Sequence, residues 1–309
     1  MREIELALPT EDGLAMAGTL AVPDGDGPHP AVLLLWPGKA DREGNVGKAR
    51  FELGRAFAEA LAAQGIAAYR YDRRGVGATG GDWRATGFFA HREDAAAVLR
   101  ELNARPEVST VGAIGYSEGA MHAAWLAGHA DVAAAVLLAC PARTGAQLMR
   151  EWMERNGSDI ALPMRLILRL FGRTPDAQIR RLTAKINATK GDVARLYGVK
   201  IPARMMREYL SHDPKPDIAA MRAPVLAING TKDIQVPVDN LDQIAEIAAT
   251  VEPQRFPDLT HLLRRDPGEP SLRNYGEQYG RPVDPELVEL VATWTATRLS
   301  REPLRYKES

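Results

Sequence analysis

The sequence is poor in cysteine and lacks a long uninterrupted apolar run. Cys140 is its single cysteine, so no internal disulfide can form, and this usage fits a reducing compartment such as the cytoplasm. No segment reaches the roughly 18 consecutive apolar residues that a transmembrane helix needs. The first residues, MREIEL, alternate like a strand and contain no apolar signal core. We therefore expect a cytoplasmic protein without a membrane span.

An excess of charge of either sign is also missing. Lys and Arg number 39 and Asp and Glu number 40, which gives a net charge of −1 and argues against nucleic-acid binding by the chain as a whole. With 309 residues and a hydrophobic content of 45%, the chain is long enough to bury a large core. This length suits one domain with an insertion.

Apolar runs and helix-like segments alternate along most of the chain, which predicts an α/β sheet. The predicted strands outside the central motif are residues 2–8, 14–22, 31–36, 66–71, 132–140, 224–230 and 251–256. The predicted helices are residues 48–64, 92–104 and 238–250, and a final helix that has Asp284 as its N-cap and Pro285 at its first position.

The most informative motif lies at residues 111–119, VGAIGYSEG, where a short apolar segment runs into Gly-x-Ser-x-Gly. Helix-forming residues 120–127 follow. A strand that turns sharply into a helix at a serine is a nucleophile elbow. The flanking Gly115 and Gly119 allow the strand and helix to approach closely around a strained serine. Ser117 is therefore the candidate nucleophile, and a turn with an idle serine is the alternative.

A serine hydroxyl needs a histidine base, which in turn needs a carboxylate, and in elbow folds they follow in the order serine, acid, histidine. Asp233 follows the predicted strand 224–230, so it lies beyond the carboxyl end of a strand, where open α/β sheets keep their chemistry. His261 lies in a loop after the strand 251–256. Of six histidines, only His212 and His261 follow the first strand after the nucleophile, and His212 precedes Asp233.

Three other carboxylates lie near these residues in the sequence. Asp258 is only three residues before His261 and is too close in sequence to reach the far ring nitrogen. Asp239 and Asp242 occupy the start and first turn of a predicted helix, where carboxylates are favoured for structural reasons. Asp233 is therefore the predicted acid.

In their order, these motifs resemble the α/β-hydrolase superfamily of serine hydrolases, and more narrowly its cytoplasmic esterase and serine-aminopeptidase-like branch. The resemblance is carried by the elbow and by residues 36–45 (WPGKADREGN), 70–77 (RYDRRGVG), 229–237 (NGTKDIQVP) and 259–262 (LTHL). It implies the α/β-hydrolase fold, which is a mostly parallel sheet with helices on both faces and a helical cap insertion. Within 70–77, we expect Asp72 and Arg73 to support the architecture of the site.

An oxyanion hole needs two backbone N–H groups aimed at the developing charge. One is expected from Glu118, directly after the nucleophile, and the resemblance implies that Lys39 supplies the second. The loop is shorter than the family pattern, because only Lys39 and Ala40 stand between its Pro-Gly pair and the following Asp-Arg pair. Lys39 could instead direct its ammonium toward a substrate carboxylate or phosphate, or be simply solvated.

Between residues 141 and 223 the alternation stops, and no convincing strand is evident. The helix-like stretches are residues 144–156, 162–171, 176–187 and 193–210. We predict a core of residues 1–140 and 224–309 and a helical cap of residues 141–223, which would shield the site and shape the acyl pocket. The apolar stretch 162–171 either covers the site or packs against the core.

The charge of this segment differs sharply from the rest. It holds 16 basic and 8 acidic residues, a net charge of +8, whereas the remainder carries −9. This polarity could draw the cap toward the acidic core, or attract an anionic or carrier-bound substrate. Solvated helix faces would account for the same charges without any binding role.

We therefore predict a serine hydrolase that cleaves a carboxylic ester or thioester of a small molecule through an acyl-enzyme. Ser117 attacks, His261 transfers the proton and Asp233 orients His261, with no metal or organic cofactor. The same residues could serve an acyltransferase or peptidase. The sequence is also compatible with a non-hydrolytic ligand-binding or epimerising member of the fold, and with a scaffold that binds partners through the cap. It leaves a homodimer open.

Overall fold

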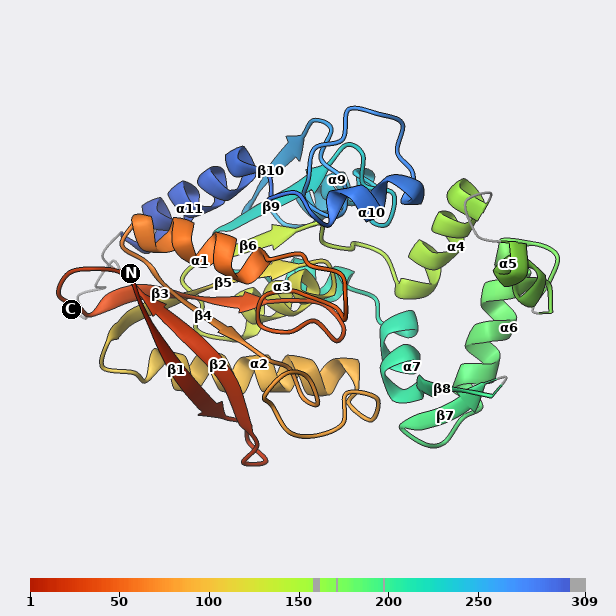
Figure 1. The fold of residues 1–309 in the computed structure, drawn as a ribbon, viewed down its shortest axis with the longest axis horizontal. Coiled ribbons are helices and arrows are strands. Elements are labelled where there is room, and N and C mark those ends of the chain that lie inside the picture. The colour runs from red at the N-terminus through yellow and green to blue at the C-terminus, as the bar shows by residue number, and fades with distance from the viewer. Residues whose placement is uncertain (158–161, 171, 197, 301–309) are drawn as a thin grey trace.

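The computed structural model describes residues 1–157, 162–170, 172–196 and 198–300, without the side chains of Met164 and Ile167. Its centre is an eight-stranded sheet in the order β1-β2-β4-β3-β5-β6-β9-β10. The strands are β1 (Arg2–Pro9), β2 (Ala15–Val22), β3 (His29–Leu35), β4 (Ala67–Tyr71), β5 (Val108–Tyr116), β6 (Ala135–Leu138), β9 (Val225–Gly230) and β10 (Val251–Phe256). Figure 1 shows the sheet in the larger part of the molecule.

The sheet is mostly parallel, as predicted. Strands β4, β3, β5, β6, β9 and β10 pair in parallel with one another, whereas β1 and β2 form an antiparallel hairpin at the edge and β2 also pairs antiparallel with β4. Because β5 lies between β3 and β6, the carboxyl ends of these three strands meet at one edge of the sheet. This edge faces the segment between β6 and β9 (Figure 1).

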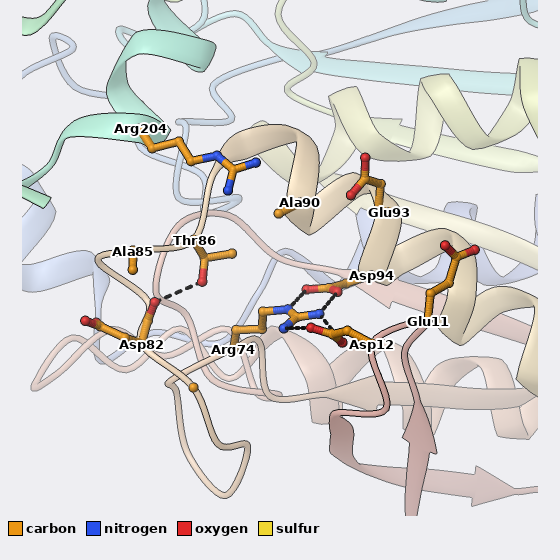
Figure 2. A pocket seen from close by; sticks show the side chains of 11 residues that line it. Glu11, Asp12, Arg74, Asp82, Ala85, Thr86, Ala90, Glu93, Asp94 and Arg204 are labelled. Atoms are coloured by element: carbon orange, nitrogen blue, oxygen red, sulfur yellow. Dashed lines mark hydrogen bonds and ion pairs between the residues drawn. The ribbon is translucent and has the colours of Figure 1, made fainter. Parts of the chain in front are cut away.

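The β1–β2 turn is fixed to the rest of the core by an arginine between two carboxylates. Arg74, in the turn after β4, donates from Nε to Asp94 Oδ2 at 2.6 Å and from Nη1 to Asp12 Oδ2 at 2.7 Å. Asp12 lies in the hairpin turn, and Asp94 lies on helix α2 (Phe88–Asn103), where its side chain is buried. Figure 2 shows this bridge beside a hollow between the turn and the helix.

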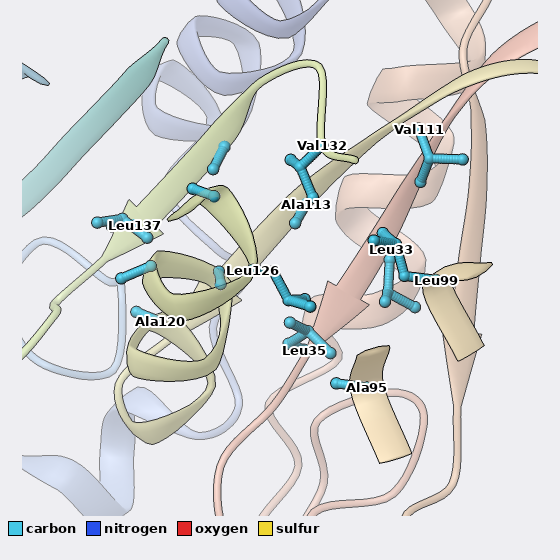
Figure 3. Close-up of a cluster of buried hydrophobic side chains, with 14 of the residues drawn as sticks. Leu33, Leu35, Ala95, Leu99, Val111, Ala113, Ala120, Leu126, Val132 and Leu137 are labelled. Atoms are coloured by element: carbon cyan, nitrogen blue, oxygen red, sulfur yellow. The ribbon is translucent and has the colours of Figure 1, made fainter. Parts of the chain in front are cut away.

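Alternate side chains of the central strands enter two different cores. On β3, Leu33 and Leu35 join one cluster, whereas Val32 and Leu34 join the other. The first cluster packs under α2 and α3 (Glu118–His129), as Figure 3 shows for Leu33, Leu35 and Leu99 among others. Both faces are therefore buried, which explains the continuous apolar runs of these strands.

The second core lies under two helices, α1 (Leu53–Ala63) and α11 (Pro285–Leu299), which contact each other. The short helices α8 (Lys215–Ala219) and α9 (Asp239–Ile247) complete the first face. The predicted start of the last helix is confirmed, because the Asp284 side chain accepts the N–H of Leu287 at 2.9 Å and Pro285 occupies the first turn. Among the described residues, none of the helices combines the length and apolar character that crossing a bilayer requires.

Residues 141–223, called the insert below, depart from the predicted helical pattern. Besides α8, the described helices of the insert are α4 (Gly145–Asn156), α5 (Leu162–Arg169), α6 (Pro175–Asn187) and α7 (Ala203–Ser211). The prediction of a helix over residues 193–210 is wrong, because this stretch begins with an antiparallel hairpin of β7 (Val193–Leu196) and β8 (Val199–Pro202). Phe171, the last residue of another predicted helix, lies outside the described residues.

The residues of the β7–β8 segment explain why it forms a hairpin. Gly198 adopts φ +82°, a left-handed conformation that glycine tolerates and that a turn requires. Val193, Val199 and Ile201 are β-branched, which favours strands over helices. The helix starts only after Pro202.

We predict that Asp284→Ala lowers the free energy of unfolding by about 1–2 kcal/mol, because the α11 N-cap is lost. Asp284→Ser retains a cap oxygen but loses the ion pair in which Arg265 Nε lies 2.7 Å from Asp284 Oδ2. Urea unfolding of the two variants therefore separates the contributions. Equal losses in both would assign the effect to the ion pair rather than to the cap.

Candidate active site

Ser117 stands at a sharp turn between β5 and α3. Its backbone has φ +54° and ψ −118°, a strained conformation for a residue with a side chain. A Cβ on Gly115 would lie 2.3 Å from the carbonyl oxygen of Gly119, and a Cβ on Gly119 would lie 2.1 Å from that of Leu35. The Ser117 N–H donates to Leu138 O on β6 at 2.8 Å. The two glycines therefore permit a contact between strand and helix that no other residue would allow.

Asp233 and His261 are in direct contact beyond the ends of β9 and β10. His261 Nδ1 lies 2.8 Å from Asp233 Oδ2, and both side chains are buried. The other carboxylate oxygen accepts the N–H groups of Gln235 and Val236, each at 2.8 Å. A carboxylate only accepts, so Nδ1 carries the proton and Nε2 is left as the basic nitrogen.

The three other carboxylates considered from the sequence have different partners. Asp239 pairs with Arg143 at 2.6 Å, and Asp242 pairs with Arg255. Asp258 lies 4.0 Å from Lys232. The contact with His261 is therefore made by Asp233.

The histidine loop is also anchored to the strand that carries the serine. The hydroxyl of Tyr116 donates to the His261 carbonyl oxygen at 2.6 Å, and the two rings lie 5.2 Å apart between centroids. Because Tyr116 immediately precedes Ser117, the position of His261 is tied directly to the elbow.

Ser117 and His261 line one cavity of about 410 Å³ between the core and the insert. The insert supplies most of the wall, and Gln235 and Val236 complete it. The lining residues from the insert are Gly145, Leu148, Met149, Trp152 and Met153 of α4, Leu168 of α5 and Tyr209 of α7. Gly145 lets α7 approach, since a Cβ there would lie 2.5 Å from the Tyr209 ring. Most of the lining residues from the insert are apolar, whereas Ser117, Gln235 and His261 bring polar groups from the core.

Lys39 lies in the loop after β3, next to the elbow. Its side chain is exposed, and its ammonium sits 5.1 Å from the centroid of the Trp83 ring, a cation–π distance. The ammonium therefore rests on Trp83, and Lys39 is not among the residues that line the cavity. The role of its backbone N–H as an oxyanion donor stays a prediction.

The side chain of Glu118 holds this loop, a feature that the sequence reasoning missed. Its Oε2 accepts the N–H of Gly38 at 2.9 Å, and its Oε1 accepts from Arg73 Nη2 at 2.9 Å and lies 3.1 Å from His122 Nε2. Arg73 also donates to Trp36 O at 3.1 Å. The spacing of Glu118 and His122, four residues apart on one helix face, was the available signal.

Burial and charge act in opposite directions on this cluster. Burial alone would raise the pKa of Glu118, but the Arg73 guanidinium and the His122 hydrogen bond outweigh it and hold that pKa well below its usual range. Burial lowers the pKa of His122 to about 4, although Glu118 opposes the effect. At neutral pH the cluster therefore contains an ionised Glu118 and a neutral His122.

The hollow in Figure 2, of about 450 Å³, lies apart from these groups. It is lined by carboxylates and arginines, among them the Arg74 bridge, and it contains none of Ser117, Asp233 and His261. Two adjacent arginines therefore bind different parts of the structure: Arg73 binds Glu118 at the elbow, and Arg74 binds Asp12 in the hairpin turn.

The sequence profile of the serine aminopeptidase S33 family matches residues 51–268, which is more than half of the chain. The chain belongs to this family. The predicted resemblance to α/β-hydrolase serine hydrolases is thereby confirmed, and with it an enzyme of that type.

Individual relatives carry esterase names. The chain is 24% identical over 284 residues to esterase EstD of Thermotoga maritima, an alignment that covers 90% of this chain and 65% of that protein. It is structurally similar to Est1E of Butyrivibrio proteoclasticus with bound ferulic acid (TM-score 0.64, 16% identity, 96% and 100% coverage). It is also similar to the Pyrococcus furiosus esterase Pf2001 (TM-score 0.64, 17% identity, 96% and 92% coverage). The two structures support the fold.

We predict that the free energy of unfolding decreases as the pH is lowered below about 6.5, because burial lowers the pKa of His122. Between its ordinary pKa of 6.5 and its folded pKa of about 4, the unfolded chain binds a proton that the folded chain excludes. The contribution of His122 to the unfolding free energy is then nearly constant above about pH 7 and falls as the pH drops toward 4. His122 alone should contribute a loss of about 2 kcal/mol between pH 7 and pH 5.

Urea unfolding of His122→Gln at the two pH values tests this, because the variant should lose that part of the slope whatever its stability at pH 7. His29→Gln, at the half-buried start of β3, is the control and should keep the wild-type slope. An unchanged slope in His122→Gln would contradict the assignment.

Proposed function

We propose that this enzyme hydrolyses carboxylic esters of small apolar molecules through an acyl-enzyme on Ser117. The observation that carries the proposal is the hydrogen bond of 2.8 Å between Asp233 and His261, beside a cavity that both His261 and Ser117 line. A buried carboxylate that fixes the tautomer of a histidine near a strained serine is the arrangement that acyl transfer requires.

In the proposed reaction, His261 Nε2 takes the hydroxyl proton as Ser117 Oγ attacks the ester carbonyl carbon. Asp233 stabilises the resulting imidazolium. The proton then passes to the leaving alcohol, and the C–O bond breaks to give the acyl-enzyme. Water, deprotonated by the same nitrogen, attacks the acyl carbon and releases the acid and the serine hydroxyl.

The substrate class follows from the cavity wall. Trp152, Met149, Met153 and Leu148 present apolar surface, and the described lining residues include no carboxylate, lysine or arginine. A peptide substrate of an aminopeptidase would bring a free α-ammonium that no carboxylate in this wall neutralises. An apolar acyl or aryl ester is favoured over a peptide for this reason. A thioester presents the same carbonyl to the same residues.

The oxyanion is proposed to bind the backbone N–H groups of Glu118 and Lys39. The carboxylate of Glu118 supports this assignment, because it engages the Gly38 N–H and so holds the loop that carries Lys39 against the elbow. Glu118 would then act twice, with its own N–H on the oxyanion and its side chain positioning the second donor.

Labelling and substitution test the proposed roles of Ser117 and Asp233. A fluorophosphonate should label Ser117, as read by mass mapping, and Ser117→Ala should abolish both labelling and turnover of apolar esters. Asp233→Asn should lower kcat roughly 10⁴-fold by stabilising the wrong tautomer. Asp258→Asn is the matched control and should retain wild-type kcat. Folded protein that resists labelling at Ser117 would refute the proposal.

Substitution of Glu118 tests its proposed role in positioning an oxyanion donor. Glu118→Gln should lower kcat about 10- to 100-fold with little change in KM, because one oxyanion donor is misplaced while ground-state binding in the apolar cavity persists. Asp94→Asn is the control, since Asp94 is an equally buried carboxylate that pairs with the neighbouring Arg74 away from the cavity. A raised KM with unchanged kcat would contradict the positioning role.

A further inference from the structure

The insert carries an exposed apolar face that the proposed chemistry does not use. Leu162, Leu166 and Leu170 are 61%, 53% and 63% exposed, and they follow one another at intervals of four residues along α5 and its end. This spacing places them on one side of the helix. We call these three residues the leucine face.

Arginines without a carboxylate partner among the described residues lie in the same segment as the leucine face. Arg165, Arg169 and Arg173 are exposed, and the sequence from Leu162 to Arg173 contains no acidic residue. Within the described part of the chain, the structure gives these three arginines no ion pair.

Some arginines elsewhere in the insert have carboxylate partners. Arg143 binds Asp239, and Arg204 binds Glu208, which lies four residues further along α7. Arg165, Arg169 and Arg173 have no such partner in the described part of the chain, so the charge of these exposed side chains is available to an external partner beside the leucine face.

The opposite side of α5 points to the cavity. Leu168 lies roughly 160–240° around the helix from the leucine face, at about 100° per residue, and it lines the cavity that holds Ser117. Figure 1 shows α5 at the outer end of the insert, on the side away from the sheet. One short helix thus separates the cavity from an exposed, basic and apolar surface.

We propose that the leucine face docks on an anionic lipid surface, with the leucines at the acyl boundary and Arg165, Arg169 and Arg173 on the lipid phosphates. A helix with leucines on one face and arginines beside them is the pattern of interfacial binding. A symmetric contact with a second copy is disfavoured, because it would bring these unpaired arginines toward their own equivalents. This inference is independent of the proposed function.

Cosedimentation with vesicles tests the proposal. The wild-type chain should pellet with vesicles of phosphatidylcholine and phosphatidylglycerol in equal parts, and remain in solution with phosphatidylcholine alone. Arg165→Gln combined with Arg169→Gln should weaken binding about 30-fold. Replacement of all three leucines by serine should weaken it roughly tenfold or more. Val199→Ser, which alters another exposed apolar residue of the insert (64% exposed), should bind as the wild type does.

Three outcomes would overturn the inference. They are absence of wild-type binding to the anionic vesicles, equal binding to both vesicle types, and a leucine variant that turns a dimer into a monomer without altering vesicle binding. Ser117 labelling and turnover of a soluble ester are measured in parallel on the same variants. They should stay at wild-type levels, so a failure of lipid binding remains distinguishable from a failure of the proposed function.

Discussion

The site depends on the contact of backbone with backbone between the start of α3 and the end of β3. Gly119 lies so close to the Leu35 carbonyl that even a methyl group would overlap it. This approach sets Ser117 in its strained conformation and brings the Glu118 side chain within reach of Gly38. The loop after β3, the elbow and the helix behind it therefore form one unit, in which a shift of any part would displace the others.

A second set of bonds links this unit to the histidine loop. Tyr116 holds the backbone of His261, and two backbone N–H groups fix the carboxylate of Asp233. Because hydrogen bonds to charged groups are stronger than neutral ones, the carboxylate is held in one orientation. The three residues reach one edge of the sheet from distant parts of the sequence, and the parallel order of β5, β9 and their neighbours makes this possible.

Sequence alone could predict what depends on local chemistry. The elbow glycines, the N-cap at Asp284 and the apolar strand runs each have a nearby physical cause, and the order of motifs points to Asp233 and His261. The sequence could not predict contacts that depend on how distant segments pack. The Glu118 carboxylate meets Gly38 across 80 positions, and Lys39 rests on Trp83. The prediction of one helix over residues 193–210 failed because the β7–β8 hairpin, which turns at Gly198, and helix α7 follow each other within that stretch.

The cavity draws its walls and its polar groups from different parts of the chain. Ser117, Asp233 and His261 belong to segments outside the insert, whereas α4 alone supplies five of the eleven lining residues. Substitutions along α4 can thus change the size and shape of the accommodated group while the hydrogen bonds around His261 stay intact. Such separation lets selection diversify specificity in one stretch of sequence without eroding reactivity, and it makes α4 the natural place to begin redesign.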